Sequence, residues 1–255
     1  MTLQTIARPL EEVRAYLDEL LQVEGQEPDS NGLVVEGPPT LARLGLAVNC
    51  SFQAIQQAAQ RGCNLLLCHH AARPSTDAHL AAQKYDKLRE HGIGLYVAHD
   101  CLDLAREFGT ADALARAARI AIQGPFKPDD EGEFGVHGMT VGSLPEFVTR
   151  VGNQLGTGVR AWKNTPSFGH VAVVPGYGAR PEWLARAQAL GCDTYLSGEG
   201  LMFAILFARE AGINLVLAGH YATETPGIMA LGARLARDLK LDITFIPETI
   251  VEAEA

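Results

Sequence analysis

The chain alternates between short apolar runs and longer segments whose apolar residues recur every three or four positions. The runs at 43–49, 64–68 and 93–99 are bounded by turn residues, which is typical of buried strands. The segments 52–62 and 76–92 have helical spacing, and each ends in a glycine. Ser51 stands where a helix cap is expected. Because strands alternate with helical segments, the pattern predicts βαβ units and a mainly parallel sheet.

The regular alternation is interrupted at 123–138, a stretch rich in glycine, proline and acidic residues. A second series of the same kind follows it. Helices are expected at 143–156, 181–191, 201–212 and 227–239, and strands at 170–176, 192–198, 213–219 and 242–247. The sequence therefore predicts two α/β units with a boundary near residue 125.

Polar clusters follow three of the predicted strands. In parallel α/β sheets, ligands bind beyond the carboxyl ends of the strands, so clusters that are distant in sequence can meet at one edge. Imidazole and carboxylate together suit Zn, Fe, Mn, Co or Ni better than Ca or Mg. The residues at these strand ends are His69 and His70 after the first strand, His99, Asp100 and Asp103 after the second, and His220 and Glu224 after the third.

Simpler explanations exist for each of these residues. A pair of adjacent histidines is more often a packing or surface feature than a metal site, and adjacent side chains converge only where the backbone turns. Asp103 or Glu224 alone would be read as a helix cap or an ion-pair partner. His99 could orient a ligand, and Glu199 could cap the following helix or reach the pocket. Their occurrence together at successive strand ends favours a metal site.

Composition and charge narrow the choice of function. The 255-residue chain is 47% hydrophobic and carries a net charge of −9, which argues against general nucleic-acid binding. It contains no apolar run long enough to predict a membrane span. Its five cysteines form no CxxC pair, so a reducing, cytoplasmic location is expected. Neither GxxxxGK[ST] nor GxGxxG occurs, and the glycine turn at 175–182 is only a weak candidate for anion binding.

Six segments together resemble a known family. They are NGLVVEG (31–37), AVNCS (47–51), NLLLCHH (64–70), YVAHDCLD (96–103), GCDTYLSGE (191–199) and AGHYATETPGIMALGARLA (218–236). In this order they are similar to the Nif-three-like dinuclear metal proteins, which are often labelled GTP cyclohydrolase I type 2 homologues. The paired histidines together with GHYATE are the most specific part of the resemblance.

The resemblance implies two divalent transition-metal ions per chain, with Glu224 and often Asp103 shared between them. It also implies two α/β domains, the second inserted into the first: residues 1–125 and 225–255 would form domain one, and 126–224 domain two. A toroidal homohexamer is expected as well. The ligands carried over from the family motifs are His69, His70, Asp103, His220 and Glu224.

The chain departs from the family pattern at two places. Leu206 stands near the position where many relatives have a histidine, so a polar group that could touch substrate is missing. Asp100-Cys101 replaces a more usual Thr-Asn, which adds an acid beside the candidate ligands.

Two functions from different classes follow from these observations. The first is a metal-dependent hydrolase that acts on GTP, another nucleotide or a phosphorylated small molecule, with His99 and Glu199 as candidate acid–base groups. The second is a non-catalytic metal-binding hexamer that serves as a scaffold, metal store or regulator. Neither function involves a membrane.

Overall fold

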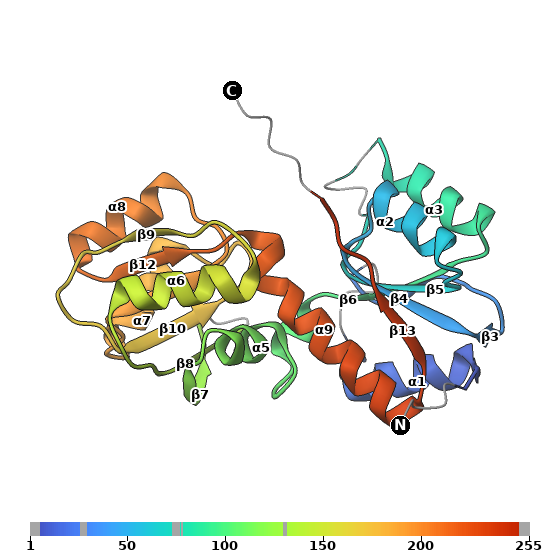
Figure 1. Cartoon of the computed structure of the whole chain (residues 1–255), viewed down its shortest axis with the longest axis horizontal. Coiled ribbons are helices and arrows are strands. Elements are labelled where there is room, and N and C mark those ends of the chain that lie inside the picture. The colour runs from blue at the N-terminus through green and yellow to red at the C-terminus, as the bar shows by residue number, and fades with distance from the viewer. Residues whose placement is uncertain (1–5, 26–29, 73–76, 78, 130–131, 250–255) are drawn as a thin grey trace. The chain divides into compact units, whose positions relative to one another are not determined.

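The chain forms two compact units in the computed structural model, which describes residues 6–25, 30–72, 77, 79–129 and 132–249. The first unit comprises Met1–Leu102 and Ile228–Ala255, and the second comprises Asp103–Gly227. The second is thus an insertion in the first. The chain crosses between them within helix α4 (Asp100–Leu104) and again within helix α9 (His220–Leu239; Figure 1). The sequence had placed these divisions near residues 125 and 225.

A five-stranded sheet forms the centre of the first unit. Its strand order is β13 (Asp242–Phe245), β4 (Arg43–Asn49), β5 (Leu65–His70), β6 (Gly94–Ala98) and β2 (Asn31–Val35). The first three pairings are parallel and the last is antiparallel. Strand β5 is nearly continuously apolar because it lies in the middle of the sheet with both faces covered. A separate antiparallel pair joins β1 (Arg8–Pro9) to β3 (Thr40–Leu41).

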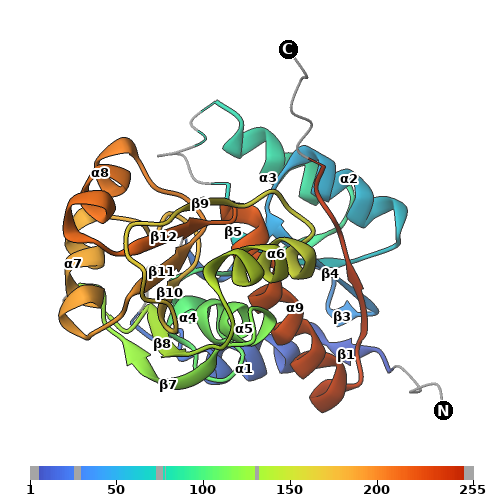
Figure 2. The same ribbon diagram turned by 60° about the vertical axis from the view of Figure 1, so that its left-hand side comes forward.

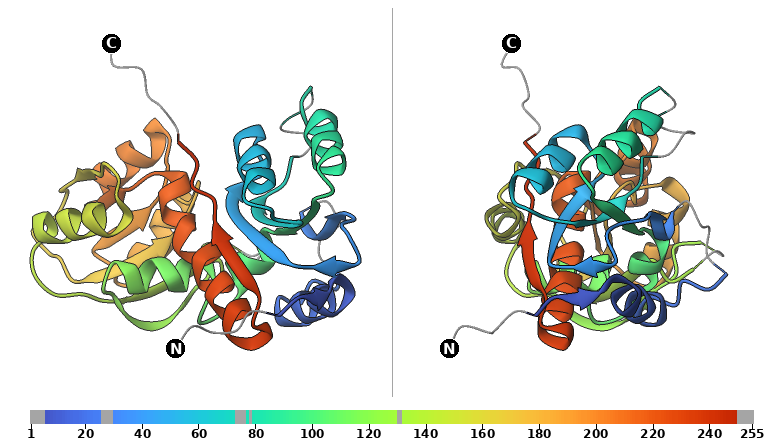
Figure 3. Two further views of the ribbon diagram at one scale, coloured as in Figure 1. Left: turned by 45° about the vertical axis from the view of Figure 1, so that its right-hand side comes forward. Right: turned by 90° about the vertical axis from the view of Figure 1, so that its right-hand side faces the viewer.

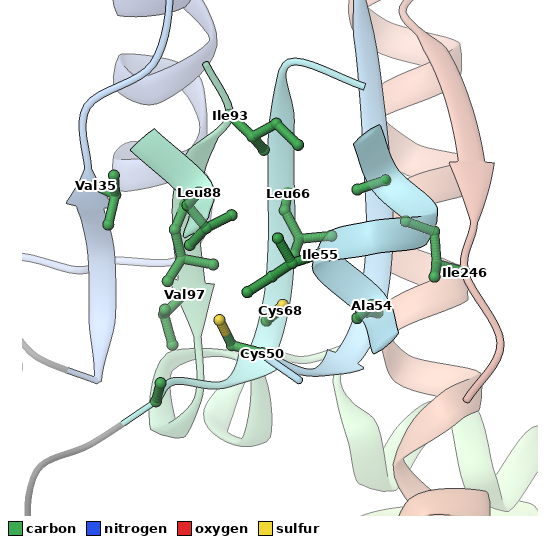
Figure 4. Packing of buried hydrophobic residues seen from close by; sticks show 14 of the residues in the cluster. Val35, Cys50, Ala54, Ile55, Leu66, Cys68, Leu88, Ile93, Val97 and Ile246 are labelled. Carbon is green, nitrogen blue, oxygen red and sulfur yellow. The ribbon is translucent and has the colours of Figure 1, made fainter. Parts of the chain in front are cut away.

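Helices α2 (Phe52–Gln60) and α3 (Ala81–Glu90) lie side by side over this sheet (Figure 3). The Ser51 side chain caps α2 by accepting a hydrogen bond from the Ala54 amide at 3.1 Å, as the sequence predicted. Ile55 and Leu88 from the two helices pack with Leu66 and Val97 of the strands in one buried cluster (Figure 4). Each such side chain contributes about 1.5–3 kcal/mol by its burial, so this cluster holds the helices on the sheet. The unit also contains helix α1 (Leu10–Leu20).

The second unit is built on a six-stranded sheet. Its order is β7 (Ala121–Phe126), β8 (Gly135–Met139), β10 (His170–Val174), β11 (Thr194–Ser197), β12 (Asn214–Leu217) and β9 (Arg160–Trp162). Only the β10–β11 and β11–β12 pairings are parallel. The α/β fold class is confirmed, but the prediction of a mainly parallel sheet is wrong for this unit. Strands β7 and β8 come from the glycine- and proline-rich stretch that reads as a boundary in the sequence.

Helices cover both faces of this second sheet (Figure 2). Helices α5 (Thr110–Ala117) and α6 (Leu144–Leu155) contribute to one buried cluster, and α7 (Pro181–Ala189) and α8 (Met202–Ala211) to the other. Alternate residues of β10 supply the two clusters, with Val173 on one face and Ala172 on the other. The two buried clusters therefore hold the strands of this sheet in place from both faces.

Helix α9 begins earlier than the sequence predicts. Pro226 and Gly227 read as a helix boundary, yet the helix starts at His220 and continues through both. Proline lacks the N–H that would bond to the preceding turn, but the helix tolerates that loss here. As a result His220 and Glu224 lie four residues apart on one helical face rather than in a loop.

Among the helices that the structure describes, none combines the length and apolarity needed to span a lipid bilayer.

Candidate metal centre

Three histidines cluster at the carboxyl end of the first sheet. The ring centroids of His69 and His70 are 4.7 Å apart, and the His99 ring stacks on His69 at 4.8 Å with an interplanar angle of 17°. Each ring offers a nitrogen, and these three nitrogens all lie within 4.8 Å of one another. Adjacent residues on a strand normally point to opposite faces, so this convergence depends on the end of β5. The arrangement could hold a metal ion.

The orientation of His69 is fixed by the neighbouring strand. Its Nδ1 lies 2.8 Å from the carbonyl oxygen of Ala98, the last residue of β6, and the ring is fully buried. A carbonyl can only accept a hydrogen bond, so Nδ1 carries the proton and Nε2 carries the lone pair. His69 therefore leaves Nε2 as the ring atom that could bind a metal ion.

His70 is oriented by a longer chain of hydrogen bonds. Its Nδ1 lies 2.7 Å from Asn49 Oδ1, and Asn49 Nδ2 donates to Glu248 Oε2 at 2.8 Å. The Asn49 backbone amide also donates to that carboxylate at 3.0 Å. The Asn49 amide is thus locked with its oxygen toward His70, and Nδ1 must be the donor. His99 follows the same rule, with its Nδ1 2.7 Å from Asp100 Oδ1.

A different arrangement occurs in the second unit, at the start of α9. His220 Nε2 lies 2.9 Å from Glu224 Oε1, and its Nδ1 lies 3.2 Å from Glu199 Oε2. Burial lowers the pKa of His220, but hydrogen bonds and charge from Glu224 and then Glu199 outweigh it and raise the pKa above 6.5. Glu224 is itself buried. The imidazole is thus held between two carboxylates, one buried and one exposed.

Gly176 makes room for this pair. An ideal Cβ at this position would lie 2.3 Å from Glu224 Oε1 and 3.1 Å from His220 Nε2, and the backbone has a φ of +60°. The Gly176 amide donates to Thr223 Oγ1 at 3.1 Å, and its carbonyl accepts from the Glu199 amide at 2.8 Å. Only glycine satisfies both the conformation and the space. The glycine turn at 175–182, considered above for anions, therefore backs the two candidate ligand atoms.

Asp103 is the first residue of the second unit and lies on α4, one turn after Asp100. Its Oδ1 accepts a hydrogen bond from the Thr110 hydroxyl. The structure thus brings His69 and His70 together with His99 in one unit. In the other unit it brings His220 and Glu224 together with Glu199. The role of Asp103 as a ligand stays a prediction from the sequence.

Several supporting residues were not predicted from the sequence. Asn49 lies at the end of a strand, so the rule that located the histidines could have located it as well. Glu248 is 199 positions away from Asn49, and no spacing or motif connects the two. The Ala98 carbonyl and the space at Gly176 become visible only in the fold.

The donor set fits a transition-metal ion. In each of the four candidate histidines, His69, His70, His99 and His220, Nδ1 is bound to an oxygen, which is how proteins fix a metal-binding histidine. Three of those oxygens belong to side chains, Asn49, Asp100 and Glu199, and one to the Ala98 backbone. Nitrogen ligands combined with a buried carboxylate suit Zn, Fe, Mn, Co or Ni.

Comparisons with known proteins agree with this description. The family model for Duf34/NIF3 (NGG1p interacting factor 3) matches residues 9–250. A "GTP cyclohydrolase 1 type 2 homolog" from Halobacterium salinarum is 34% identical over 242 residues, covering 91% of this chain and 94% of that protein. One of the same description from Deinococcus radiodurans is 30% identical over 243 residues, covering 92% of each.

Solved structures show the same architecture. The protein ybgI, described as of unknown function, matches with a TM-score of 0.85 and 26% identity, covering 94% of this chain and 98% of that one. Reduced HcgD from Methanocaldococcus jannaschii matches with a TM-score of 0.80 and 26% identity, covering 95% and 99%.

Proposed function

This chain belongs to the Duf34/NIF3 family, and from that premise we propose that it is a metal-dependent hydrolase acting on a nucleotide or phosphoester. The observation that carries the proposal is the cluster of three imidazoles, each held by a hydrogen bond at Nδ1 so that Nε2 is available to bind an ion or to transfer a proton. We propose two divalent transition-metal ions per chain, with the ligands His69, His70, Asp103, His220 and Glu224.

The proposed chemistry follows from what such ions supply and what the residues can do. Divalent ions bound there would lower the pKa of a coordinated water and polarise a substrate oxygen. His99 has Nδ1 fixed by Asp100, so we assign it proton transfer at Nε2. Glu199 accepts from His220 Nδ1, so we assign it the positioning of that ring rather than contact with substrate.

The choice of substrate rests on the names of relatives. Curated relatives are described as GTP cyclohydrolase 1 type 2 homologues, which is a statement about similarity. GTP is therefore the first compound to test, followed by simple phosphoesters such as p-nitrophenyl phosphate. Fold and metal ligands alone do not fix a substrate.

The hydrolase proposal is tested by activity of the metal-supplied protein. The wild type and a His69→Ala, Glu224→Ala double variant would be stripped with chelator, supplied with Zn, Mn, Fe, Co or Ni, and assayed with GTP and p-nitrophenyl phosphate. We expect turnover that needs metal and falls at least about 100-fold in the double variant. Equal activity in both proteins, or activity indifferent to chelation, contradicts the proposal.

One observation favours a second, non-catalytic function. Leu201, Met202 and Phe203 follow Glu199 in the sequence and are all more than 60% exposed, so this segment offers an apolar surface in place of acid–base groups. A metal-binding scaffold, store or regulator would need no such groups. Stable metal binding without turnover of any nucleotide or phosphoester would support this alternative over the hydrolase.

We also propose the homohexamer that the family resemblance implies. Light scattering during size-exclusion chromatography is expected to give six times the 27.4 kDa chain mass. A monomeric mass at micromolar concentration would contradict it.

A further inference from the structure

Among the residues that the structure describes, Asn31, Asn64 and Asn214 support the backbone in the same way. The side-chain oxygen of each accepts hydrogen bonds from two backbone amides. Asn214 Oδ1 accepts from residues 164 and 165 at 2.9 and 3.2 Å, and Asn64 Oδ1 from residues 42 and 43 at 3.0 and 3.2 Å. Asn31 Oδ1 accepts from residues 99 and 101 at 3.1 and 3.2 Å. In all three the amide orientation is fixed, because only the oxygen can accept.

The side-chain nitrogen Nδ2 of Asn31 differs from that of Asn64 and Asn214 in its hydrogen bonding. Asn214 Nδ2 donates to the Ser167 carbonyl at 2.8 Å and to Thr194 Oγ1 at 3.3 Å, and Asn64 Nδ2 donates to the Thr40 carbonyl at 2.7 Å. Asn31 is 97% buried, yet its Nδ2 has no acceptor among the residues that the structure describes. Buried donors are almost always satisfied, so an unsatisfied one points to a bound partner such as a water molecule, an ion or a ligand.

The position of Asn31 indicates where that partner lies. Asn31 is paired with Ala98 across the antiparallel β2–β6 ladder, and the Ala98 carbonyl is the group that holds His69 Nδ1. In the parallel β5–β6 ladder Leu67 is in register with Tyr96, so two residues later His69 and Ala98 share a face. Asn31, Ala98 and His69 therefore form a row across three adjacent strands, with the small alanine in the middle.

Contacts at the end of β6 also connect Asn31 to the imidazole cluster. The His99 amide donates to both Asn31 Oδ1 and the Ser30 carbonyl, and the His99 ring stacks on His69. The Ser30 hydroxyl is also buried and without an acceptor in the described part of the chain. Two buried donors that lack acceptors among the described residues thus lie at the start of β2, next to the His99 backbone.

We propose that Asn31 Nδ2 donates a hydrogen bond to an oxyanion, such as a phosphate group, bound at the His69–His70–His99 cluster. This inference rests on the proposed metal centre and deepens it, because it assigns the cluster a ligand with an oxygen acceptor. A donor fixed in advance by two backbone amides binds such an oxygen without first having to be ordered.

The test uses zinc-loaded full-length protein and inorganic phosphate. Nuclear magnetic resonance would follow the side-chain NH₂ signals of Asn31 and Asn214, each assigned by its disappearance in the corresponding Asn→Asp variant. We expect phosphate to shift the Asn31 NH₂ signals and to leave those of Asn214 in place. An Asn31 NH₂ signal that stays unmoved when phosphate binds contradicts the inference.

Calorimetry on variants gives a second, independent readout. Asn31→Asp keeps the accepting oxygen and removes the donor, while Asn31→Ala removes both without adding charge. We expect both to bind zinc with wild-type stoichiometry and phosphate about ten-fold or more weakly. The matched Asn214→Asp is expected to lower the melting temperature, since it loses two hydrogen bonds, and to leave phosphate affinity unchanged.

The possible failures can be told apart. A wild-type chain that takes up no zinc overturns the metal centre and this inference together. Wild-type protein that binds zinc but no phosphate overturns this inference alone. Unchanged phosphate affinity in both Asn31 variants does the same.

Discussion

Two groups of candidate ligands hold their histidines by Nδ1 but differ in the charge of the groups around them. The first corner is the cluster of His69, His70 and His99, and the second corner is His220 with Glu224 and Glu199. In the first unit, His69 and His70 rest on neutral oxygens, the Ala98 carbonyl and the Asn49 amide. In the second unit, a single imidazole, that of His220, lies between two carboxylates. In both groups an oxygen acceptor holds Nδ1, so Nε2 is the candidate ligand atom of each ring. Among the atoms that could bind a cation, the first corner offers imidazole nitrogens, and the second offers one imidazole nitrogen together with the buried Glu224 carboxylate.

Removing a histidine from either corner should have the largest effect. We expect His69→Ala and His220→Ala each to weaken metal binding by about 100-fold or more, because an ion with few protein ligands loses one of them. Competition against a fluorescent chelator measures the affinity. His137→Ala is the matched control, since His137 belongs to a histidine pair elsewhere in the second unit. An equal loss of metal affinity in His137→Ala would contradict the assignment of His69 and His220 as metal ligands.

Filling the space at Gly176 should damage the second corner alone. Gly176→Ala adds a methyl group 2.3 Å from Glu224 Oε1 at a positive φ. We expect a cost of about 3 kcal/mol in the free energy of unfolding, measured with urea, together with weakened metal binding. Gly156→Ala has a φ of +63° and nothing within 4 Å, so it should cost only about 1 kcal/mol. Equal costs would mean that the contact with Glu224 is unimportant.

Loosening His70 should affect the first corner to a smaller degree. Asn49→Ala removes the acceptor that fixes the ring, and we expect metal affinity to fall about 10- to 100-fold. Glu248→Gln should have a milder effect, because the amide oxygen can still accept from Asn49. A wild-type affinity in Asn49→Ala would separate the hydrogen bond from metal binding.

The smallest effect is expected at the control pair itself. Burial, and then the neighbouring His170, lower the pKa of His137 below 6.5. The unfolded chain therefore binds a proton at His137 more readily than the folded chain does. The contribution of His137 to the free energy of unfolding is fully present above pH 6.5 and is lost as the pH falls below that value. We expect His137→Asn to reduce the difference in unfolding free energy of the metal-free protein between pH 7.5 and pH 5.5. An unchanged difference would show that His137 does not contribute to it.

Much of the fold could be predicted because local patterns agree with it. The apolar run at 43–49 is strand β4, and Ser51 caps the next helix as expected. The stretch 123–138 was predicted to be a boundary between the two units because its glycines and prolines are typical of linkers. The backbone there instead pairs as strands β7 and β8. The start of α9 was predicted too late for a similar reason. Pro226 has a low helix propensity, but tertiary packing stabilises the helix through this residue.

The candidate site was predictable only in its histidines and acids. His69, His70 and His220 follow strands in the sequence, so topology alone suggests their location. Their hydrogen-bond partners come from distant segments, as Glu248 does for Asn49, and no local pattern encodes such a pairing. The significance of Asn31 depends on the lack of an acceptor for its Nδ2 among the described residues, which only the packed structure shows.

The most direct test of the account is elemental analysis of chelator-stripped protein after zinc is supplied and excess zinc is removed. We expect about two ions per chain in the wild type. We expect a reduced count in His70→Ala and in His220→Ala, and an unchanged count in His137→Ala. A wild-type chain that remains metal-free, or variants that keep the full count, would contradict the assignment of these two corners as a metal centre.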